Sequence, residues 1–340
     1  DVSKIANDAM DASFNGTVSA DANQGVYIPA KETLKVLNLS LSSGTPNFTK
    51  TSIDDKTNGI YSAKDDLGTS YYFRGNVTNN YVKFANKYWR IIRINGDGTI
   101  RMIYAGTSAH ANGYDDSSAH DMSIGTSVFN SRDNDNTYVG YMYGTVGAST
   151  YANTHSNTTN STIKTKLDSW YDTNIVNTGN EKYIADAIYC NDRSVSSGTG
   201  IGTTVTTYAA YTRMSNGTPT LKCTNNNDKF TKSTTIGNGK LTKMIGLITS
   251  DEVMYAGGKY ATDNHEYYLY SREYYWTMAP KSFYNNANSK FASINNLYSS
   301  GYLTSSNADW TIPTVRPVVS LKSDAISGGS GTAASPFLVG

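Results

Sequence analysis

The sequence predicts an α+β fold of twisted antiparallel β-sheets, a few short helices and long loops. Three observations support this fold class. Residues 88–104 alternate bulky and charged side chains, which indicates a β-hairpin. Residues 105–161 contain few aliphatic residues and many Asn, Ser, Asp and Gly, as is typical of long surface loops. Apolar residues at helical spacing from Ile163 indicate a helix that packs against a sheet.

Residues 1 to about 50 are predicted to form a helical or extended lead-in to one main domain, residues 51–340. Apolar residues at helical spacing between Val2 and Met10 favour a first helix, and Pro29 favours a second that contains Leu34 and Leu37. No charged and then apolar leader opens the chain. We therefore expect Asp1 to follow a processed segment, and the lead-in to be the remnant of a stalk or membrane anchor.

The hairpin is the best-defined local prediction. Its two alternating strands flank Asn95–Gly98, whose residues favour the left-handed backbone of a tight turn. Arg90, Arg93 and Arg101 could be mistaken for an anion site. On a half-buried hairpin such residues usually lie on the wet face, so we expect them to be solvated.

The next elements are less regular. Tyr138–Tyr143 is predicted as a short strand, and Ile163, Leu167 and Trp170 as one face of a helix capped by Asn160 or Ser161.

Three elements follow in the second half of the chain. The sequence leaves Glu181–Ile188 open as either a helix or a strand. Met244–Ile248 is predicted as a buried strand, and Ser250–Glu252 as the capped start of a short helix that ends at Gly257–Gly258.

Composition excludes several classes of function. The formal net charge of this 340-residue chain is +1, and no basic run reaches five residues, so nucleic acid is not an expected partner. No apolar run approaches the roughly 18 residues that span a bilayer. Only 17% of the residues are charged, and neutral polar residues are abundant, as in many secreted bacterial β proteins. Cys190 and Cys223 favour one disulfide in an exported chain, with two buried thiols as the alternative.

No pattern of chemistry-bearing residues predicts an enzyme or a cofactor. The four histidines lack HxxxH or HExxH spacing, and no nucleophile elbow or phosphate-binding loop is present. The polar stretches His110–Asp121 and Asp133–Asn136 offer oxygen ligands that would suit calcium, although local turns are the expected role of such residues. The acid pairs are expected to mark solvated turns or helix starts; they are Asp65/Asp66, Asp115/Asp116 and Asp251/Glu252.

Five stretches in order carry a resemblance: Tyr88–Ile92, Ser161–Tyr171, Ile248–Val253, Tyr275–Pro280 and Val315–Leu321. They resemble an uncharacterised family of bacterial secreted or surface domains with WRII, YWTMSP and VRPV strands. The latter half is similar, more weakly, to the C-type-lectin-like and formylglycine-generating-enzyme fold. That enzyme uses a late pair of cysteines, and residues 224–340 contain none, so the resemblance implies a binding scaffold without the oxidation chemistry.

In this fold, the variable proteins of diversity-generating retroelements bind ligands through late loops around the Trp strand. Residues 265–310 contain twelve aromatic residues interleaved with Asn, Ser and Gly, a mixture common in recognition loops. The candidate contacts are therefore Tyr267, Tyr270, Arg272, Tyr274, Phe283, Tyr284, Asn285, Asn286, Asn288, Asn296, Tyr298 and Tyr302. Aromatic cross-strand pairs with polar loops are the structural alternative for any one of them.

The sequence thus favours a secreted or cell-surface protein that displays a binding or adhesive surface for a glycan or a protein. Full burial of Tyr274, Tyr284 and Tyr302 would contradict this hypothesis. A structural subunit or tip protein of a surface fibre or pilus-like assembly ranks second. A glycan-active enzyme ranks third, and a pocket that brings two carboxylates together would support it.

Overall fold

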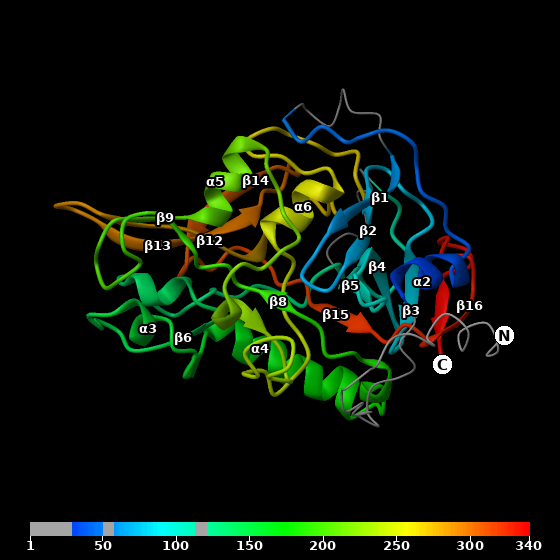
Figure 1. The fold of residues 1–340 in the computed structure, drawn as a ribbon, viewed down its shortest axis with the longest axis horizontal. Helices are drawn as coiled ribbons and strands as arrows, with labels where there is room; N and C mark the ends of the chain where they lie inside the picture. Colours follow the sequence, from blue (N-terminus) through cyan, green and yellow to red (C-terminus); the bar gives the residue numbers. More distant parts are fainter. Residues whose placement is uncertain (1–28, 50–57, 113–120) are drawn as a thin grey trace, which may run out of the picture.

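The computed structural model describes residues 29–49, 58–112 and 121–340, and its architecture is mixed α+β (Figure 1). An eight-stranded sheet, with its cyan strands on the right of the view, and a five-stranded sheet, mainly orange and on the left, make up the frame. One continuous hydrophobic core contains residues of both sheets. The predicted α+β class is confirmed, whereas the C-type-lectin-like arrangement stays a prediction.

The eight-stranded sheet is organised around β4 (Lys87–Ile94). One edge of β4 pairs with β5 (Ile100–Tyr104), which pairs in turn with β15 (Val318–Leu321). The other edge pairs with β3 near the start of β4 and with β2 near its end. The remaining bounds are β1 (Gly59–Lys64), β2 (Thr69–Arg74), β3 (Tyr81–Phe84), β16 (Ile326–Gly328) and β17 (Phe337–Val339). Among these described strands, only the pair β3–β17 is parallel.

The predicted hairpin is confirmed as β4 and β5. The Asn95 amide donates to the Thr99 carbonyl and the Gly98 amide to the Asn95 carbonyl, both at 2.8 Å. Gly98 has φ 86°, the left-handed conformation that the turn requires and that glycine adopts without strain.

The five-stranded sheet is antiparallel, with the order β14-β13-β12-β10-β9. Its long hairpin, β12 and β13, projects from the left side of the molecule in Figure 1. The bounds are β9 (Val195–Ser197), β10 (Thr206–Tyr208), β12 (Tyr275–Asn285), β13 (Lys290–Leu297) and β14 (Leu303–Asn307). Trp276 on β12 is fully buried and contacts Phe129 edge to face at 5.9 Å, so this strand is part of the scaffold.

The helices are short. The predicted helix from Ile163 is α4, which Ser161 caps by accepting the Lys164 amide, and its Trp170 packs against Trp89 of the sheet at 6.1 Å. The helix after Ile248 is α6, where Thr249 and Glu252 form a capping box and Gly257 ends the helix, so both helices are confirmed. The bounds are α2 (Ala30–Val36), α3 (Tyr151–Thr154), α4 (Thr162–Tyr171), α5 (Ala209–Asn216) and α6 (Ser250–Ala256).

Helix α2 follows Pro29 as predicted, but it packs as part of the domain. Ala30 and Leu34 are buried in the main core, together with Leu37 and Leu39 beyond the helix. The helix predicted between Val2 and Met10 lies outside the described residues.

The strand predicted at 138–143 is largely wrong. Asn136–Val139 is a 3-10 turn, because the Asp135 carboxylate accepts the Thr137 amide and caps it. Only Met142–Tyr143 is extended as β6, which pairs with β7 (Thr159–Asn160). The segment left open at 181–188 begins with another 3-10 turn, Glu181–Tyr183, and leads into β8 (Tyr189–Cys190), which pairs with β11 (Lys229–Phe230).

The segment Met244–Ile248 is buried as predicted, but it joins two sheets instead of lying within one. Gly246 bridges to Val318 of β15 through two backbone hydrogen bonds of 2.9 and 3.0 Å. Two residues later, the Ile248 carbonyl accepts the Met278 amide of β12 at 2.7 Å. The segment is therefore buried but is not a strand of either sheet, because its hydrogen bonds go to a different sheet at each end.

The expectation of solvated arginines on the hairpin is wrong. Arg90, Arg93 and Arg101 are 1%, 7% and 1% exposed, and six of the nine arginines in the chain are buried. Each has polar partners: Arg90 donates to Asn80, Asn112 and the Val77 carbonyl at 2.6 to 2.8 Å. Burial lowers the pKa of Arg90 to about 10, which still leaves it charged at neutral pH.

Glu252 of α6 holds two of these arginines. Its carboxylate accepts Arg93 of β4 at 3.0 Å and pairs with Arg101 of β5 at 2.6 Å, and it also accepts the Thr249 amide at 3.0 Å. Arg93 pairs in addition with Asp65 at 2.9 Å. Despite burial, the arginines lower the pKa of the Glu252 carboxyl, so the network is ionised at neutral pH.

We predict that Glu252→Gln lowers the free energy of unfolding by about 3–5 kcal/mol, because two buried guanidinium groups lose their carboxylate. The matched control is Glu32→Gln, which breaks the exposed Glu32–Lys35 pair of α2 and costs about 1 kcal/mol or less. Urea unfolding of both variants is the measurement. Equal losses in the two variants would contradict a central role for Glu252.

Candidate functional site

Four of the predicted contact residues lie in the interior: Tyr267, Tyr270, Phe283 and Asn296. The Tyr267 hydroxyl donates to the Gly301 carbonyl at 2.8 Å, and Asn296 donates to Ser306 at 2.6 Å across β13 and β14. Phe283 is fully buried. We correct these four from contact residues to scaffold residues, because their side chains meet protein atoms and not solvent.

The remaining candidates divide between the two ends of the β12–β13 hairpin. Tyr274 precedes β12, and Tyr298 follows β13 where Tyr275 pairs with Leu297. Tyr284 lies ten residues from Tyr274, which corresponds to about 33 Å along an extended strand. A single small ligand cannot span both ends, so the predicted surface is two separate surfaces.

The hairpin tip carries Tyr284, Asn285, Asn286 and Asn288. Tyr284 is 43% exposed and stacks on Phe291 at 5.1 Å, a cross-strand pair. Asn286 accepts the amides of Asn288 and Ser289 and donates to the Tyr284 hydroxyl. Asn285 donates to the Thr203 carbonyl at 2.7 Å. The Asn286 side chain therefore holds the turn, and the Asn285 side chain attaches the hairpin to the segment that contains Thr203. Both have the structural role that the sequence left open.

The hairpin base carries four aromatic rings in successive contact, which we call the ring row: Tyr302, Tyr298, Tyr274 and Trp310. Tyr302 stacks on Tyr298 at 4.7 Å, Tyr298 meets Tyr274 edge to face at 4.4 Å, and Tyr274 meets Trp310 edge to face at 5.4 Å. Trp310 is 36% exposed and the tyrosines are half-buried. Tyr274, Tyr284 and Tyr302 are thus not fully buried, and the binding hypothesis stays a prediction.

Trp310 is the ring that sequence reasoning did not list. It follows β14 in a turn where its amide donates to the Asn307 carbonyl at 3.0 Å. Most tryptophans are largely buried. A tryptophan in a polar segment that ends a strand departs from this pattern, and that is the signal for exposure which the sequence carries at Trp310.

Backbone hydrogen bonds fix the ring row. The Tyr274 carbonyl accepts the amide and hydroxyl of Thr314 at 2.7 and 2.9 Å. A tight turn joins Tyr298 and Tyr302, with hydrogen bonds of 2.8 Å between them and 2.9 Å from the Gly301 amide to the Tyr298 carbonyl. Gly301 has φ 85°, and a Cβ there would collide with the Asn264 carbonyl. The rings are therefore preorganised by the scaffold.

The hydroxyl groups of Tyr274 and Tyr302 stay protonated at neutral pH. Burial and then the hydrogen bond with Tyr298 raise the pKa of Tyr274 to about 12. Burial, Tyr298 and Asp263 raise the pKa of Tyr302. The row offers neutral hydroxyls beside apolar ring surface.

Arg272, two residues before Tyr274, is half-buried and interacts with other groups. Its φ of 59° is unusual for a residue with a side chain. This backbone turns the chain sharply just before the first ring of the row.

A second polar feature is a cavity of about 40 Å³ behind the disulfide, large enough for one or a few water molecules. The acid pairs Asp65/Asp66 and Asp251/Glu252 both line it. Asp251 and Glu252 begin α6, so the helix-start alternative is confirmed for that pair. Asp65 is buried, so the expectation of a solvated turn is wrong for that residue. Asp115 and Asp116 lie outside the described residues.

The cavity brings carboxylates together, which is the arrangement that the enzyme hypothesis requires, but basic groups engage them. Arg213 pairs with both Asp192 and Asp251 at 2.8 Å, and Lys229 pairs with Asp66 at 3.0 Å. Arg93 pairs with both Asp65 and Glu252, and Arg101 pairs with Glu252. Such matched pairs fit a structural network better than an acid and base pair that must exchange protons.

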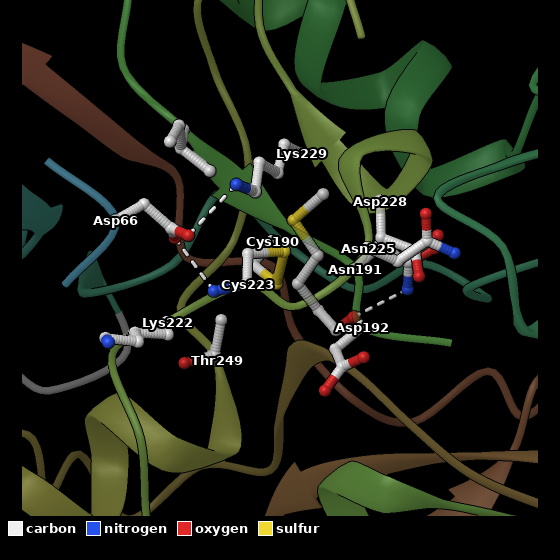
Figure 2. The surroundings of a disulfide bond; sticks show 12 residues. Asp66, Cys190, Asn191, Asp192, Lys222, Cys223, Asn225, Asp228, Lys229 and Thr249 are labelled. Carbon is white, nitrogen blue, oxygen red and sulfur yellow. Dashed lines mark hydrogen bonds and ion pairs between the residues drawn. A yellow bond between two sulfur atoms is a disulfide. The ribbon is translucent and has the colours of Figure 1, made fainter. Parts of the chain in front are cut away.

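The predicted disulfide Cys190–Cys223 is present, so the alternative of two buried thiols is wrong. Figure 2 shows Asp66 and Asp192 on opposite sides of the bridge. Asp66 accepts the Cys223 amide at 2.8 Å while it pairs with Lys229. The bridge closes a loop with a sequence separation of 33 that carries α5 and Arg213. It therefore holds Arg213 next to its two aspartates.

Among the described residues, no group of three or more His, Cys, Asp or Glu side chains could hold a metal ion. Asp135, considered for calcium, accepts the amides of Thr137 and Gly147 and so makes a local turn. His110 and Asp121 hydrogen bond to each other, and His120 lies outside the described residues.

We predict that Cys190→Ser with Cys223→Ser lowers the free energy of unfolding by about 3–4 kcal/mol, from the loop-closure entropy of a loop of this length. Urea unfolding with and without reductant is the measurement. Reductant should bring the wild type to the midpoint of the double variant and leave that variant unchanged. A wild-type urea midpoint that does not change when reductant is added would contradict the prediction.

Next to Trp310, Asp309 raises the pKa of Asp133 to about 6, after the larger effect of burial. A raised carboxyl pKa means that stability is lost as pH rises from about 4, the unfolded value, to about 6. We predict that Asp309→Asn stabilises the protein at pH 7.5 by about 1 kcal/mol or less, given solvent screening, and has no such effect at pH 4. Denaturation at both pH values is the measurement.

The control is Asp324→Asn, an exposed aspartate outside this pair. A stability gain from Asp309→Asn that is the same at both pH values would rule out the repulsion between Asp133 and Asp309.

Comparison of the chain with protein-family models, with curated proteins and with solved structures gave no match. Within the described residues, no helix is long and apolar enough to cross a membrane. The interpretation of function therefore depends on the geometry of the ring row and its surroundings.

Proposed function

We propose that the protein is an exported bacterial surface protein that binds a glycan through the ring row. The observation that carries the proposal is the unbroken contact of four partly exposed rings, Tyr302, Tyr298, Tyr274 and Trp310. The disulfide supports export, because disulfides persist in oxidising compartments. The matched charges of the cavity support a binding protein rather than an enzyme.

A glycan suits the ring row because of its chemistry. A sugar presents an apolar C–H face surrounded by hydroxyl groups. Tyr and Trp present an apolar ring with a polar tip, so the ring covers the sugar face and the tip hydrogen bonds to hydroxyls. Ser299 and Ser300, which adjoin Tyr298 in the same turn, add further hydroxyl groups.

The size of the row also favours a glycan over a protein. A fully exposed aromatic side chain offers about 200 Å², and these rings are about one-third exposed or less, so together they expose about 300 Å² at most. A stable protein interface needs about 800 Å² on each partner. The row alone falls short of that area but can cover a few sugar units.

We predict that Trp310→Ala weakens glycan binding tenfold or more, because it removes the most exposed ring of the row and the edge contact with Tyr274. Binding to a glycan array and titration against the best hit are the measurements. Trp310 is at the surface, so its removal should leave the thermal midpoint within a few degrees of the wild type.

The matched control is Tyr284→Ala, which removes an exposed ring from the far tip of the same hairpin. Binding should change less than twofold. A loss in Tyr284→Ala with none in Trp310→Ala would move the site to the hairpin tip, and no binding to any array member would refute the proposal.

A further inference from the structure

We propose that the ring row selects uncharged glycans and rejects glycans that carry carboxylate or sulfate groups. This inference depends on the proposed function, since it names the class of ligand that the same site takes. It is argued from the charges that surround the rings.

Acidic side chains border the row at both ends. At one end, Asp263 is exposed and accepts the Ser300 hydroxyl at 2.6 Å, in the turn that joins Tyr298 and Tyr302. At the other end, Asp309 is exposed and directly precedes Trp310 in the chain. Each end of the row therefore adjoins an exposed residue that bears a carboxylate.

The second acid at the Trp310 end is Asp133, which lies beside Asp309 on a different segment of the chain. Burial, and then the charge of Asp309 and a hydrogen bond with it, raise the pKa of Asp133. The Ala292 amide donates to the Asp133 carbonyl and the Ala308 amide to the Ala292 carbonyl, so β13 holds both acid-bearing segments in place. The negative charge at this end is therefore fixed by backbone hydrogen bonds.

The groups that shift the pKa of the ring-row tyrosines differ from those that act on other tyrosines. Arg316 acts on the hydroxyl of Tyr104, and Arg132 acts on that of Tyr138. In the described part of the chain, the groups that shift the pKa of Tyr274 and Tyr302 are tyrosines, Ser299 and Asp263, with no lysine or arginine among them. The charged group that acts on these hydroxyls is thus an aspartate, Asp263, beside Tyr302.

Most of the arginines lie in the interior of the protein. Six of the nine are buried, including Arg316, whose guanidinium lies beneath the start of β12 and donates to the Leu269 carbonyl at 2.9 Å. Arg272, the arginine closest in sequence to Tyr274, is half-buried and engaged with other groups. Recognition of acidic sugars generally uses an arginine or lysine at the surface. Here most arginines lie in the interior, and the exposed Arg132 interacts with the Tyr138 hydroxyl.

The size of the effect follows from Coulomb's law. Repulsion between two neighbouring like charges is stronger near a protein surface than in bulk water, and we expect one such repulsion to weaken binding by about tenfold, or about 1.4 kcal/mol. The repulsion is screened by salt, because the Debye length falls from about 30 Å at 0.01 M to about 3 Å at 1 M.

The test is an array of neutral oligosaccharides, each printed beside carboxylated and sulfated counterparts of the same backbone, with titration of the best matched pair. We expect the neutral member to bind at least tenfold more tightly at about 0.01 M salt, and the difference to shrink at about 1 M salt. Asp263→Asn combined with Asp309→Asn should strengthen binding of the acidic member severalfold.

The outcomes separate the two proposals. Acidic members that bind as tightly as their neutral counterparts, through Trp310, would overturn the charge selection and leave the glycan-binding function standing. Acidic members that stay weak in the double aspartate variant, with its fold intact, would show that the aspartates are not the cause. No binding to any glycan would overturn the proposed function itself, and the charge selection with it.

Discussion

The carboxylate of Glu252 is the contact on which the rest of the fold depends. It lies at the first turn of α6, where it closes the capping box with Thr249, and it holds Arg93 of β4 and Arg101 of β5 in the interior. A buried guanidinium without a carboxylate would cost several kcal/mol, so the three groups are stable only together. The adjacent Asp251 extends the network to Arg213 of α5 and so to the loop that the disulfide closes.

This network also determines where the ring row lies. Just before α6, the Ile248 carbonyl accepts the Met278 amide of β12, and Gly246 bonds to β15. Arg316 then holds the chain before β12 by donating to the Leu269 carbonyl and by covering the Tyr275 ring at 4.9 Å. The base of the β12–β13 hairpin is therefore attached to the core on several sides, while its tip projects into solvent (Figure 1). Rings at the base are held more rigidly than rings at the tip, which favours the base as the binding surface.

The sequence predicts elements whose signals are local. The turn Asn95–Gly98, the Ser161 cap and the short helix that starts after Ile248 depend on residues within a few positions, and all three are confirmed. The burial of Arg93 depends on Glu252, which is 159 positions away, and no local pattern carries that information. Alternation alone predicts that the arginines face solvent, because it cannot show that the Glu252 carboxylate lies on the same side of the strands.

Local sequence patterns are limited in the same way at the candidate site. The aromatic composition of residues 265–310 identifies the segment that contains the ring row, but it could not distinguish Tyr267, whose hydroxyl is bonded in the core, from Tyr298, whose ring contacts its neighbours in the row. Nor could it show that the two ends of one strand are about 33 Å apart. With six of the nine arginines in the interior, however, the outer surface has few of the residues best suited to bind acidic ligands. The internal network and the acidic border of the ring row are thus two results of one distribution of charge, which connects the proposed preference for uncharged glycans to the interior of the protein.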